Sequence, residues 1–254
     1  MKKLAVAVCA AVAAASGAFA GNIYYFDPVN GKDTNDGLSE TTAFEHLSKK
    51  SGAQASDGDE LRLMKGVYKE SLSINRCNIT VRGWKASRDE VIIDGEGVRR
   101  GIQVNGKRAM VANLTVRDAY HEASAANAVN CGAGIQLYEV GAVASNCVVY
   151  GCRNAKHCGG GIYLAAASNV VEYCFVSNCL SASGAPGIYA ANQCVGQVIH
   201  DTTVVCCTNM VASDSAGSGC GGGSDFPACK RSKYSSYLSR WSFGANMFVK
   251  QKRW

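Results

Sequence analysis

The feature that most constrains the fold of this chain is an internal repeat with a period close to 27 residues. The dipeptide Gly-Ile begins at residues 101, 134, 161 and 187, so its copies are 33, 27 and 26 residues apart. Other short segments recur with the same period, such as NCVVYGC from Asn146 and YCFVSNC from Tyr173. Several phrases in step at one period are typical of architectures in which successive units stack on each other.

Each repeat carries the pattern of short strands. Apolar residues alternate with others at Leu114 and Val116, and again at Cys147 and Val149, between Gly, Asn and Ser residues. Alternation with a period of two predicts strands, and no segment has the 3.6-residue periodicity that helical repeats need. We therefore predict about six parallel coils over residues 61–210, stacked ~4.8 Å apart.

These stretches resemble the right-handed parallel β-helix proteins of the pectate-lyase-like superfamily, which share the pectin lyase fold. The resemblance covers residues 23–209 and is carried by the repeats and by three phrases, IYYFDPVNGKDTNDGL from Ile23, GDELRLMKGVYKESLSI from Gly58 and DEVIIDGEGV from Asp89. It implies an all-β fold, a right-handed parallel β-helix, and a polysaccharide as the partner.

Residues 1–20 have the layout of a secretory signal peptide. Lys2 and Lys3 precede an apolar run, and Ala18-Phe19-Ala20 forms a small-x-small cleavage site. We therefore expect a secreted protein, whether extracellular, periplasmic or on the cell surface.

Residues 21–60 form the expected entry segment. Thr42-Ala43-Phe44-Glu45 spells a capping box, which predicts a short capping helix over residues 42–50. Such a helix would cover the open end of the solenoid, where an unpaired strand edge invites aggregation.

Two stretches interrupt the repeat. The spacing of 33 leaves surplus residues within Tyr120 to Asn130, which predicts a protruding loop. After Met210 the sequence becomes Gly/Ser-rich and then basic over residues 211–254. One interpretation is a linker with a terminal cap; the other is that the chain is a truncated or frame-altered copy of a longer β-helix.

The charge distribution argues against nucleic acid as a partner. The formal net charge is +6, but the excess lies at the two ends, and residues 21–211 hold 17 basic and 18 acidic side chains. A neutral body lacks the electrostatic footprint of a nucleic-acid-binding domain. No stretch after the signal reaches the ~18 to 20 apolar residues of a transmembrane segment.

The cysteines follow the repeat. Cys131 and Cys158, Cys147 and Cys174, and Cys152 and Cys179 are each 27 residues apart, and Cys207 extends the last set by 28. Equivalent positions in neighbouring coils predict stacks of buried, reduced thiols. Disulfides between coils and a zinc site are the alternatives.

The entry segment holds three carboxylates, Asp27, Asp33 and Asp36, between Asn and Gly residues. Carboxylate oxygens in a tight loop are ligands for calcium, so calcium could bind here. The same residues are common turn formers, which is the alternative.

Four residues follow Gly-Ile directly and share one outward position: Gln103, Gln136, Tyr163 and Tyr189. Amides and aromatic rings suit sugars, so we predict carbohydrate binding along this ladder. The alternative is lateral packing, which stabilises any exposed sheet.

Four residues are candidates for acid/base chemistry: Arg117, Glu172, His200 and Asp201. Arg117 could remove a proton α to a uronate carboxylate, but Asp201 on the same face lies three coils away, ~14 Å at the strand spacing. Glu172 and His200 occupy equivalent positions at a coil corner near Asp201, where a salt link is the alternative to an acid/base pair.

The sequence therefore predicts a secreted β-helix protein that binds polysaccharide without a complete catalytic site. The first alternative is a polysaccharide lyase or glycoside hydrolase of the pectate-lyase-like superfamily. The second is a truncated fragment of such an enzyme without a function of its own.

Overall fold

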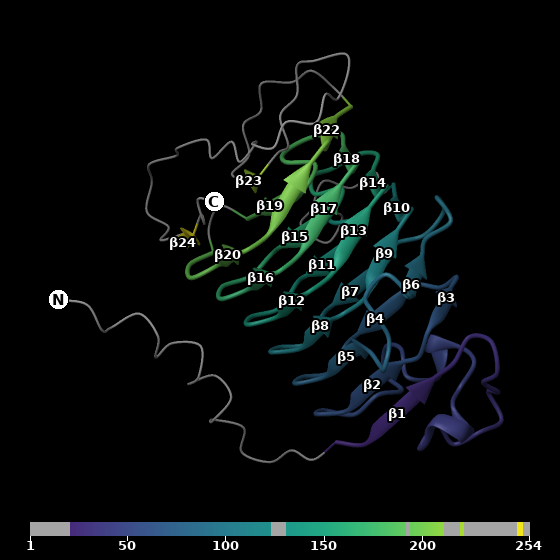
Figure 1. Cartoon of the computed structure of the whole chain (residues 1–254). Helices are drawn as coiled ribbons and strands as arrows, with labels where there is room; N and C mark the ends of the chain where they lie inside the picture. Colours follow the sequence, from purple (N-terminus) through teal and green to yellow (C-terminus); the bar gives the residue numbers. More distant parts are fainter. Residues whose placement is uncertain (1–20, 123–130, 192–193, 211–218, 221–247, 251–254) are drawn as a thin grey trace.

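The computed structural model describes residues 21–122, 131–191, 194–210, 219–220 and 248–250. They form an all-β solenoid in which the chain passes through stacked sheets coil after coil (Figure 1). The predicted signal peptide lies outside the described residues, as does most of the predicted tail.

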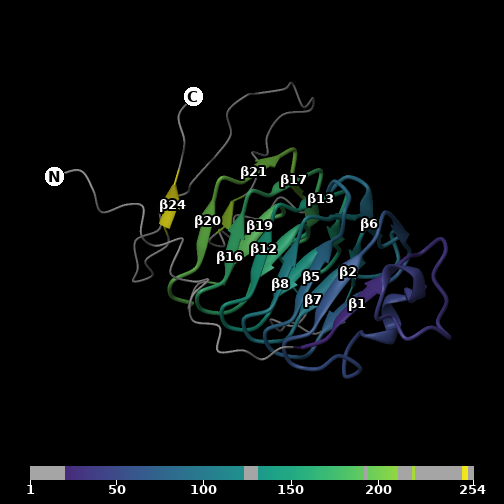
Figure 2. The ribbon, with the colours of Figure 1, turned by 60° about the horizontal axis from the view of Figure 1, so that its bottom comes forward.

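Four sheets, named here A to D, make up the solenoid. Sheet A has the order β1 (Ile23–Phe26), β2 (Glu60–Leu63), β5 (Thr80–Gly83), β8 (Met110–Ala112), β12 (Val143–Ser145), β16 (Val170–Glu172), β20 (Val198–His200) and β24 (Phe248–Lys250). Sheet C consists of β3 (Gly66–Tyr68), β6 (Val91–Asp94), β9 (Thr115–Arg117), β13 (Val148–Tyr150), β17 (Phe175–Ser177) and β21 (Thr203–Val205). Sheet A runs the length of the solenoid, as Figure 2 shows.

The other two sheets complete each coil. Sheet D contains β10 (Tyr120–His121), β14 (Arg153–Asn154), β18 (Leu180–Ser181) and β22 (Thr208–Asn209). Sheet B contains β4 (Leu72–Ile74), β7 (Ile102–Val104), β11 (Ile135–Leu137), β15 (Ile162–Leu164), β19 (Ile188–Ala190) and β23 (Gly219–Cys220). Strands pair in parallel in all four sheets, except that β23 pairs with β19 in the antiparallel sense.

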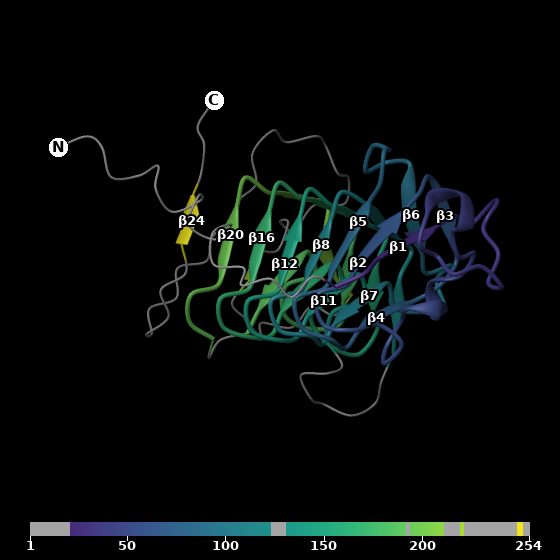
Figure 3. The ribbon, with the colours of Figure 1, turned by 90° about the horizontal axis from the view of Figure 1, so that it is seen from below.

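The stacked coils confirm the repeat analysis (Figure 3). Ile102, Ile135, Ile162 and Ile188 pair in register across sheet B. Sheet C has six strands, which matches the prediction of about six coils.

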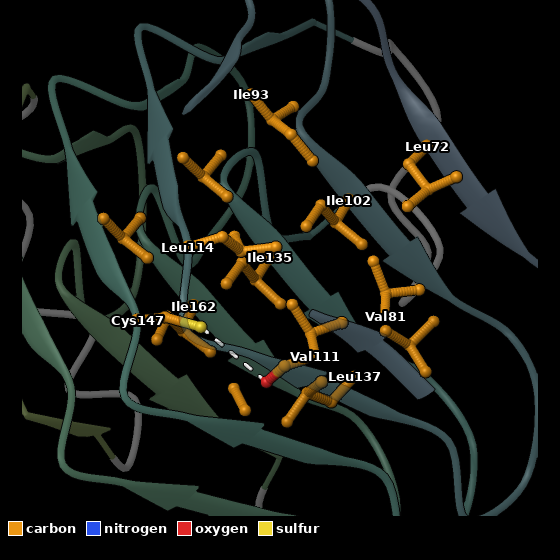
Figure 4. Close-up of a cluster of buried hydrophobic side chains, with 14 of the residues drawn as sticks. Leu72, Val81, Ile93, Ile102, Val111, Leu114, Ile135, Leu137, Cys147 and Ile162 are labelled. Carbon is orange, nitrogen blue, oxygen red and sulfur yellow. Dashed lines mark hydrogen bonds between the residues drawn. The ribbon is translucent and has the colours of Figure 1, made fainter. Parts of the chain in front are cut away.

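The core is built from the residues that the alternation predicts. Leu114, Val116 and Val149 are fully buried, and Figure 4 shows Ile102, Ile135 and Ile162 in the same interior. Burial of one such side chain contributes about 1.5–3 kcal/mol. Because every coil adds side chains to the same interior rows, the core is continuous along the solenoid.

Gly101, Gly134 and Gly161, each the first residue of a Gly-Ile pair, lie where neighbouring coils approach closely. A Cβ on Gly134 would lie 2.5 Å from the carbonyl oxygen of Gly161 and 2.7 Å from Cγ1 of Val149. Neither a backbone oxygen nor a core methyl can move away cheaply, since the interior is close-packed. The repeat of Gly-Ile therefore records a steric requirement at this position.

We expect Gly134→Ala to destabilise the protein by about 1–3 kcal/mol, the usual range for overpacking. Thr203→Ala, which changes an exposed side chain of β21, is the control and should leave stability nearly unchanged. The measurement is the free energy of unfolding from urea denaturation. Equal stability of the two variants would contradict the close-approach argument.

The cysteine prediction is confirmed for five residues and wrong for one pair. The five buried cysteines without a disulfide are Cys147, Cys152, Cys174, Cys179 and Cys207. Cys131 and Cys158 instead form a disulfide with their Cα atoms 5.0 Å apart. This pair does not belong to the apolar core cluster, so the argument for packed interior thiols does not apply to it.

The predicted capping helix over residues 42–50 is wrong. The segment contains two short 3₁₀ turns, Glu40–Thr42 and Leu47–Lys49, and the capping box is formed by Ser39 and Thr42. Phe44 is drawn into extended pairing with β1, because its N–H donates to Tyr25 and its carbonyl accepts from Asp27. The buried rings of Phe44 and Phe26 pack against each other within the core, so an irregular segment packs where the helix was expected.

The predicted loop at Tyr120 to Asn130 begins as a strand. Tyr120 and His121 form β10, which pairs with β14, and residues 123–130 lie outside the described ranges. No helix in the described part of the chain is long and apolar enough to span a membrane.

Candidate functional site

A group of acidic, basic and aromatic side chains lies where sheet A turns into sheet C. We call it the corner site and define it by Ser145, Glu172, Tyr173, Phe175, His200 and Asp201. These residues come from the ends of β12, β16 and β20, from the turns that follow, and from β17. The site therefore draws on three successive coils.

His200 is the centre of the polar contacts. Its Nε2 lies 3.0 Å from Oε2 of Glu172, and its Nδ1 lies 3.1 Å from Oδ2 of Asp201. Ser145 Oγ donates to the second oxygen of Glu172 over 2.9 Å. A hydroxyl, a carboxylate, an imidazole and a second carboxylate thus follow one another in a hydrogen-bonded chain.

The register of sheet A explains this arrangement. Ser145, Glu172 and His200 are direct neighbours in adjacent strands. The residues before them in each strand, Ala144 and Val171, are buried, so alternation turns the polar residues outward. Their side chains consequently stack in one outward row.

Aromatic side chains border this row. Tyr173 and Phe175 are 53% and 36% exposed, the largest aromatic exposures recorded among the described residues. The Tyr173 ring meets the His200 ring edge-on with the centroids 5.5 Å apart. An exposed ring and a set of hydrogen-bonding groups therefore share one surface.

The backbone of Tyr173 is unusual. Its φ angle is +54°, a left-handed conformation that is uncommon for a bulky residue. Arg88, from the segment between β5 and β6, donates to the carbonyl oxygen of Tyr173 over 3.0 Å and to Oδ1 of Asn146 over 3.1 Å. Arg88 thus holds the turn from a part of the chain 85 residues away.

The structure brings together three of the four predicted acid/base residues. Glu172, His200 and Asp201 are in contact, and the predicted salt link is the contact that joins them. Sequence reasoning missed Ser145 and Arg88. Ser145 lies 27 residues before Glu172, so the repeat could have found it; no repeat signal points to Arg88.

Arg117 lies apart from this group and is engaged elsewhere. Its guanidinium lies 2.7 Å from Oδ2 of Asp94, a carboxylate that sequence reasoning missed. Hydrogen bonds with Tyr150 and Asp94 raise the pKa of Arg117. Burial would raise the pKa of Asp94, but hydrogen bonds from the Glu96 N–H and from Arg117 outweigh it and lower that pKa. A guanidinium held in its charged form is a poor proton acceptor.

The predicted carbohydrate ladder is in register but partly covered. Gln103, Gln136, Tyr163 and Tyr189 pair in order across sheet B, and the two tyrosine rings stack with centroids 5.6 Å apart. Gln136 and Tyr163 are only 1% and 3% exposed.

The cover over this ladder comes from the segments next to the disulfide. Gln136 Nε2 donates to the carbonyl of Cys131 over 3.0 Å. A Cβ on Gly132 would lie 2.8 Å from Cβ of Tyr163. The middle of the ladder is therefore packed against protein, and its ends, Gln103 and Tyr189, keep partial exposure.

The three entry-segment carboxylates serve separate turns. Asp27 accepts from the N–H groups of Val29 and Asn30, and Asp36 accepts from the N–H of Leu38. Asp33 accepts from the N–H of His46. The described residues contain no group of three or more acidic, His or Cys side chains placed to hold a metal. These three aspartates do not converge on one point.

Asp33 and His46 form an ion pair with 2.9 Å between Oδ2 and Nδ1. The hydrogen bond with Asp33 raises the pKa of His46. Burial would raise the pKa of Asp33, but hydrogen bonds from His46 and Glu45 lower it. The pair therefore stays charged over a wider pH range than the two isolated groups, whose ordinary pKa values are about 3.9 for Asp and about 6.5 for His.

We predict that this ion pair stabilises the entry segment at pH 5.5 and ceases to do so at alkaline pH. A raised pKa in the folded state gives stability below the unfolded pKa, which is lost as pH rises through the folded one. His46→Gln should therefore cost less than about 1 kcal/mol at pH 5.5, because the pair is exposed, and nothing at pH 8.5. Urea denaturation at both pH values measures the difference, and a pH-independent loss would contradict it.

No protein-family model and no curated protein matches the chain. Among solved structures it is similar to the GH136 lacto-N-biosidase from Eubacterium ramulus. The selenomethionine derivative gives a TM-score of 0.45 at 14% identity, covering 72% of this chain and 43% of that one. The native protein gives 0.37 at 12% identity, covering 73% and 52%. The chain thus spans about half the length of these structures.

Proposed function

We propose that this chain is an exported β-helix protein that binds an extracellular or cell-surface polysaccharide at the corner site. The observation that carries the proposal is the exposed Tyr173 ring beside the hydrogen-bonded chain of Glu172, His200 and Asp201. The site as proposed binds and orients a glycan and has no complete catalytic set.

The aromatic side chains would supply contact area. A sugar ring has an apolar face of C–H groups, and an aromatic ring combines a large apolar surface with low conformational entropy. Tyr173 offers such a ring on the outside of the solenoid, and Phe175 is exposed two residues further on. Exposure of two aromatics is costly in water unless a ligand covers them.

The polar side chains would orient the bound sugar through hydrogen bonds. The carboxylates of Glu172 and Asp201 can accept hydrogen bonds from sugar hydroxyls, and His200, whose two nitrogens contact these carboxylates, would hold them in position. A few placed polar groups beside an apolar surface is the usual composition of a small-molecule site. The existing contacts hold these side chains in place before a ligand arrives, so little side-chain entropy would be lost on binding.

The solenoid suits a polymer. Its outward rows repeat at the coil spacing of ~4.8 Å, so adjacent coils present successive contacts along one line. The partly exposed Gln103 and Tyr189 lie on sheet B, apart from the corner site, and the covered Gln136 and Tyr163 support that sheet.

Two further parts of the proposal concern the handedness of the coils and the location of the protein. We infer a right-handed coil, as in the pectate-lyase-like superfamily, because connections between parallel strands of one sheet are right-handed in about 98% of cases. We infer export from the signal-like residues 1–20.

The binding test uses the mature protein, residues 21–254, in affinity electrophoresis through gels that contain neutral or uronate-rich polysaccharides. We expect retardation by at least one glycan and about tenfold weaker binding for Tyr173→Ala, since loss of a stacked ring costs about 1–1.5 kcal/mol. Glu172→Gln should also weaken binding.

Val140→Ala is the control for the binding test. Val140 is an exposed side chain that precedes β12, at the opposite end of that strand from Ser145, and its loss should leave retardation unchanged. Wild-type mobility unaffected by every glycan, or equal effects of the Tyr173 and Val140 variants, would contradict the proposal.

A specific observation favours one alternative, an enzyme that uses the corner site. An imidazole between two carboxylates can pass a proton from one to the other, which is the chemistry of general acid/base catalysis. Glycoside hydrolases likewise use a pair of carboxyl groups about the scissile bond. The alternative thus needs cleavage, not only binding.

The enzyme test follows unsaturated uronate absorbance and new reducing ends during incubation with the same glycans. Binding without turnover is the outcome expected from our proposal. Turnover that His200→Gln abolishes would establish the alternative at the corner site, and turnover that Arg117→Ala abolishes would place it on sheet C instead.

A further inference from the structure

We infer that the buried ladder of Cys152, Cys179 and Cys207 is a site of reversible disulfide modification that holds one bond at a time, in either of two positions. This inference is independent of the proposed function. It rests on the register of sheet D, on burial, and on the disulfide that the neighbouring ladder already contains.

The register places the three cysteines in line. Each one directly precedes a strand of sheet D, and those strands pair in parallel through Arg153, Leu180 and Thr208. The N–H of Leu180 donates to the carbonyl of Cys152 over 2.8 Å, and the N–H of Thr208 donates to that of Cys179 over 3.0 Å. Consecutive members therefore belong to consecutive coils.

Coil spacing of this kind suits a disulfide. Cα atoms in neighbouring strands lie ~4.8 Å apart, within the 4.4–6.8 Å range of natural disulfides. Cys131 and Cys158, which are also one coil apart, form a bond with a Cα separation of 5.0 Å. One step along the solenoid is thus a bonding distance.

The thiols face each other in the interior. Cys152, Cys179 and Cys207 are completely buried, and the register of sheet D places Cys179 between the other two. The neighbouring Cys152 thiol, together with burial, raises the pKa of Cys179. A protonated, buried thiol reacts slowly, so the bond forms during folding or local opening and not in the closed solenoid.

The middle cysteine decides the outcome. Cys152 and Cys207 lie two coils apart, roughly twice the ~4.8 Å strand spacing, which exceeds the ~7 Å limit for a disulfide. Either bond must therefore use Cys179, and the two bonds exclude each other. The remaining thiol can attack the bond and move it along the ladder.

The reaction consumes one small-molecule disulfide. A cysteine thiolate attacks it, releases one small thiol and leaves a mixed disulfide on the protein. The second cysteine thiolate displaces the second small thiol. Two S–H protons leave the protein, one S–S bond of the reagent is reduced, and one S–S bond between coils is formed.

The test refolds the mature protein in oxidised and reduced glutathione and maps disulfides by mass spectrometry. Oxidant is raised until the Cys131–Cys158 bond has formed, which is the internal control. We expect the wild type to contain a mixture of Cys152–Cys179 and Cys179–Cys207 bonds. Because Cys206 is adjacent to Cys207 and is itself disulfide-bonded, the bond at Cys207 is assigned by fragmentation of the linked peptides.

Single alanine variants distinguish the two possible disulfide bonds. Cys152→Ala should retain only the Cys179–Cys207 bond, Cys207→Ala only the Cys152–Cys179 bond, and Cys179→Ala neither. Alanine keeps the site small and apolar, and the two end variants decide the question even if the central one fails to fold. A Cys152–Cys207 bond, or no ladder bond in samples where Cys131–Cys158 has formed, would overturn the inference.

Discussion

Hydrogen bonding between parallel strands of successive coils is the interaction on which every other feature of this molecule depends. It fixes a register in which each side chain lies over its equivalent one coil earlier, as with Val143, Val170 and Val198 in sheet A. Residues at equivalent positions of the repeat therefore form rows along the solenoid. The buried isoleucine row, the close approach at Gly134 and the thiol ladder all follow from this one constraint.

The same register produces two outward rows of side chains that differ in their exposure. In sheet B the segments that carry the Cys131–Cys158 disulfide fold over the row and bury Gln136 and Tyr163. In sheet A the row of Glu172 and His200 stays partly exposed, because the chain leaves the strand there through a tight turn. Strand position alone thus does not decide which outward row can meet a ligand. The cover comes from the connections between strands.

The sequence was informative where the period is constant and failed where it varies. Glu172 and His200 were predicted to be equivalent because the later coils keep spacings of 27 and 28 residues. Asp94 pairs with Arg117 at a spacing of 23, so a search at 27 could not find it. The capping box at Thr42 failed for another reason: the pairing of Phe44 with β1 outweighs the local preference for a helix.

The turn at Tyr173 links the fold to the proposed binding site. Equivalent turns hold Asn113, Asn146 and Asp201, also with positive φ angles, and Asn and Asp tolerate that conformation better than other side chains. A tyrosine there costs stability, of order 1–3 kcal/mol for a strained backbone. The Arg88 hydrogen bond and the contact with His200 offset part of this cost. An asparagine would satisfy the turn more easily but would present no ring, so the strain is best explained by a use for the exposed aromatic surface.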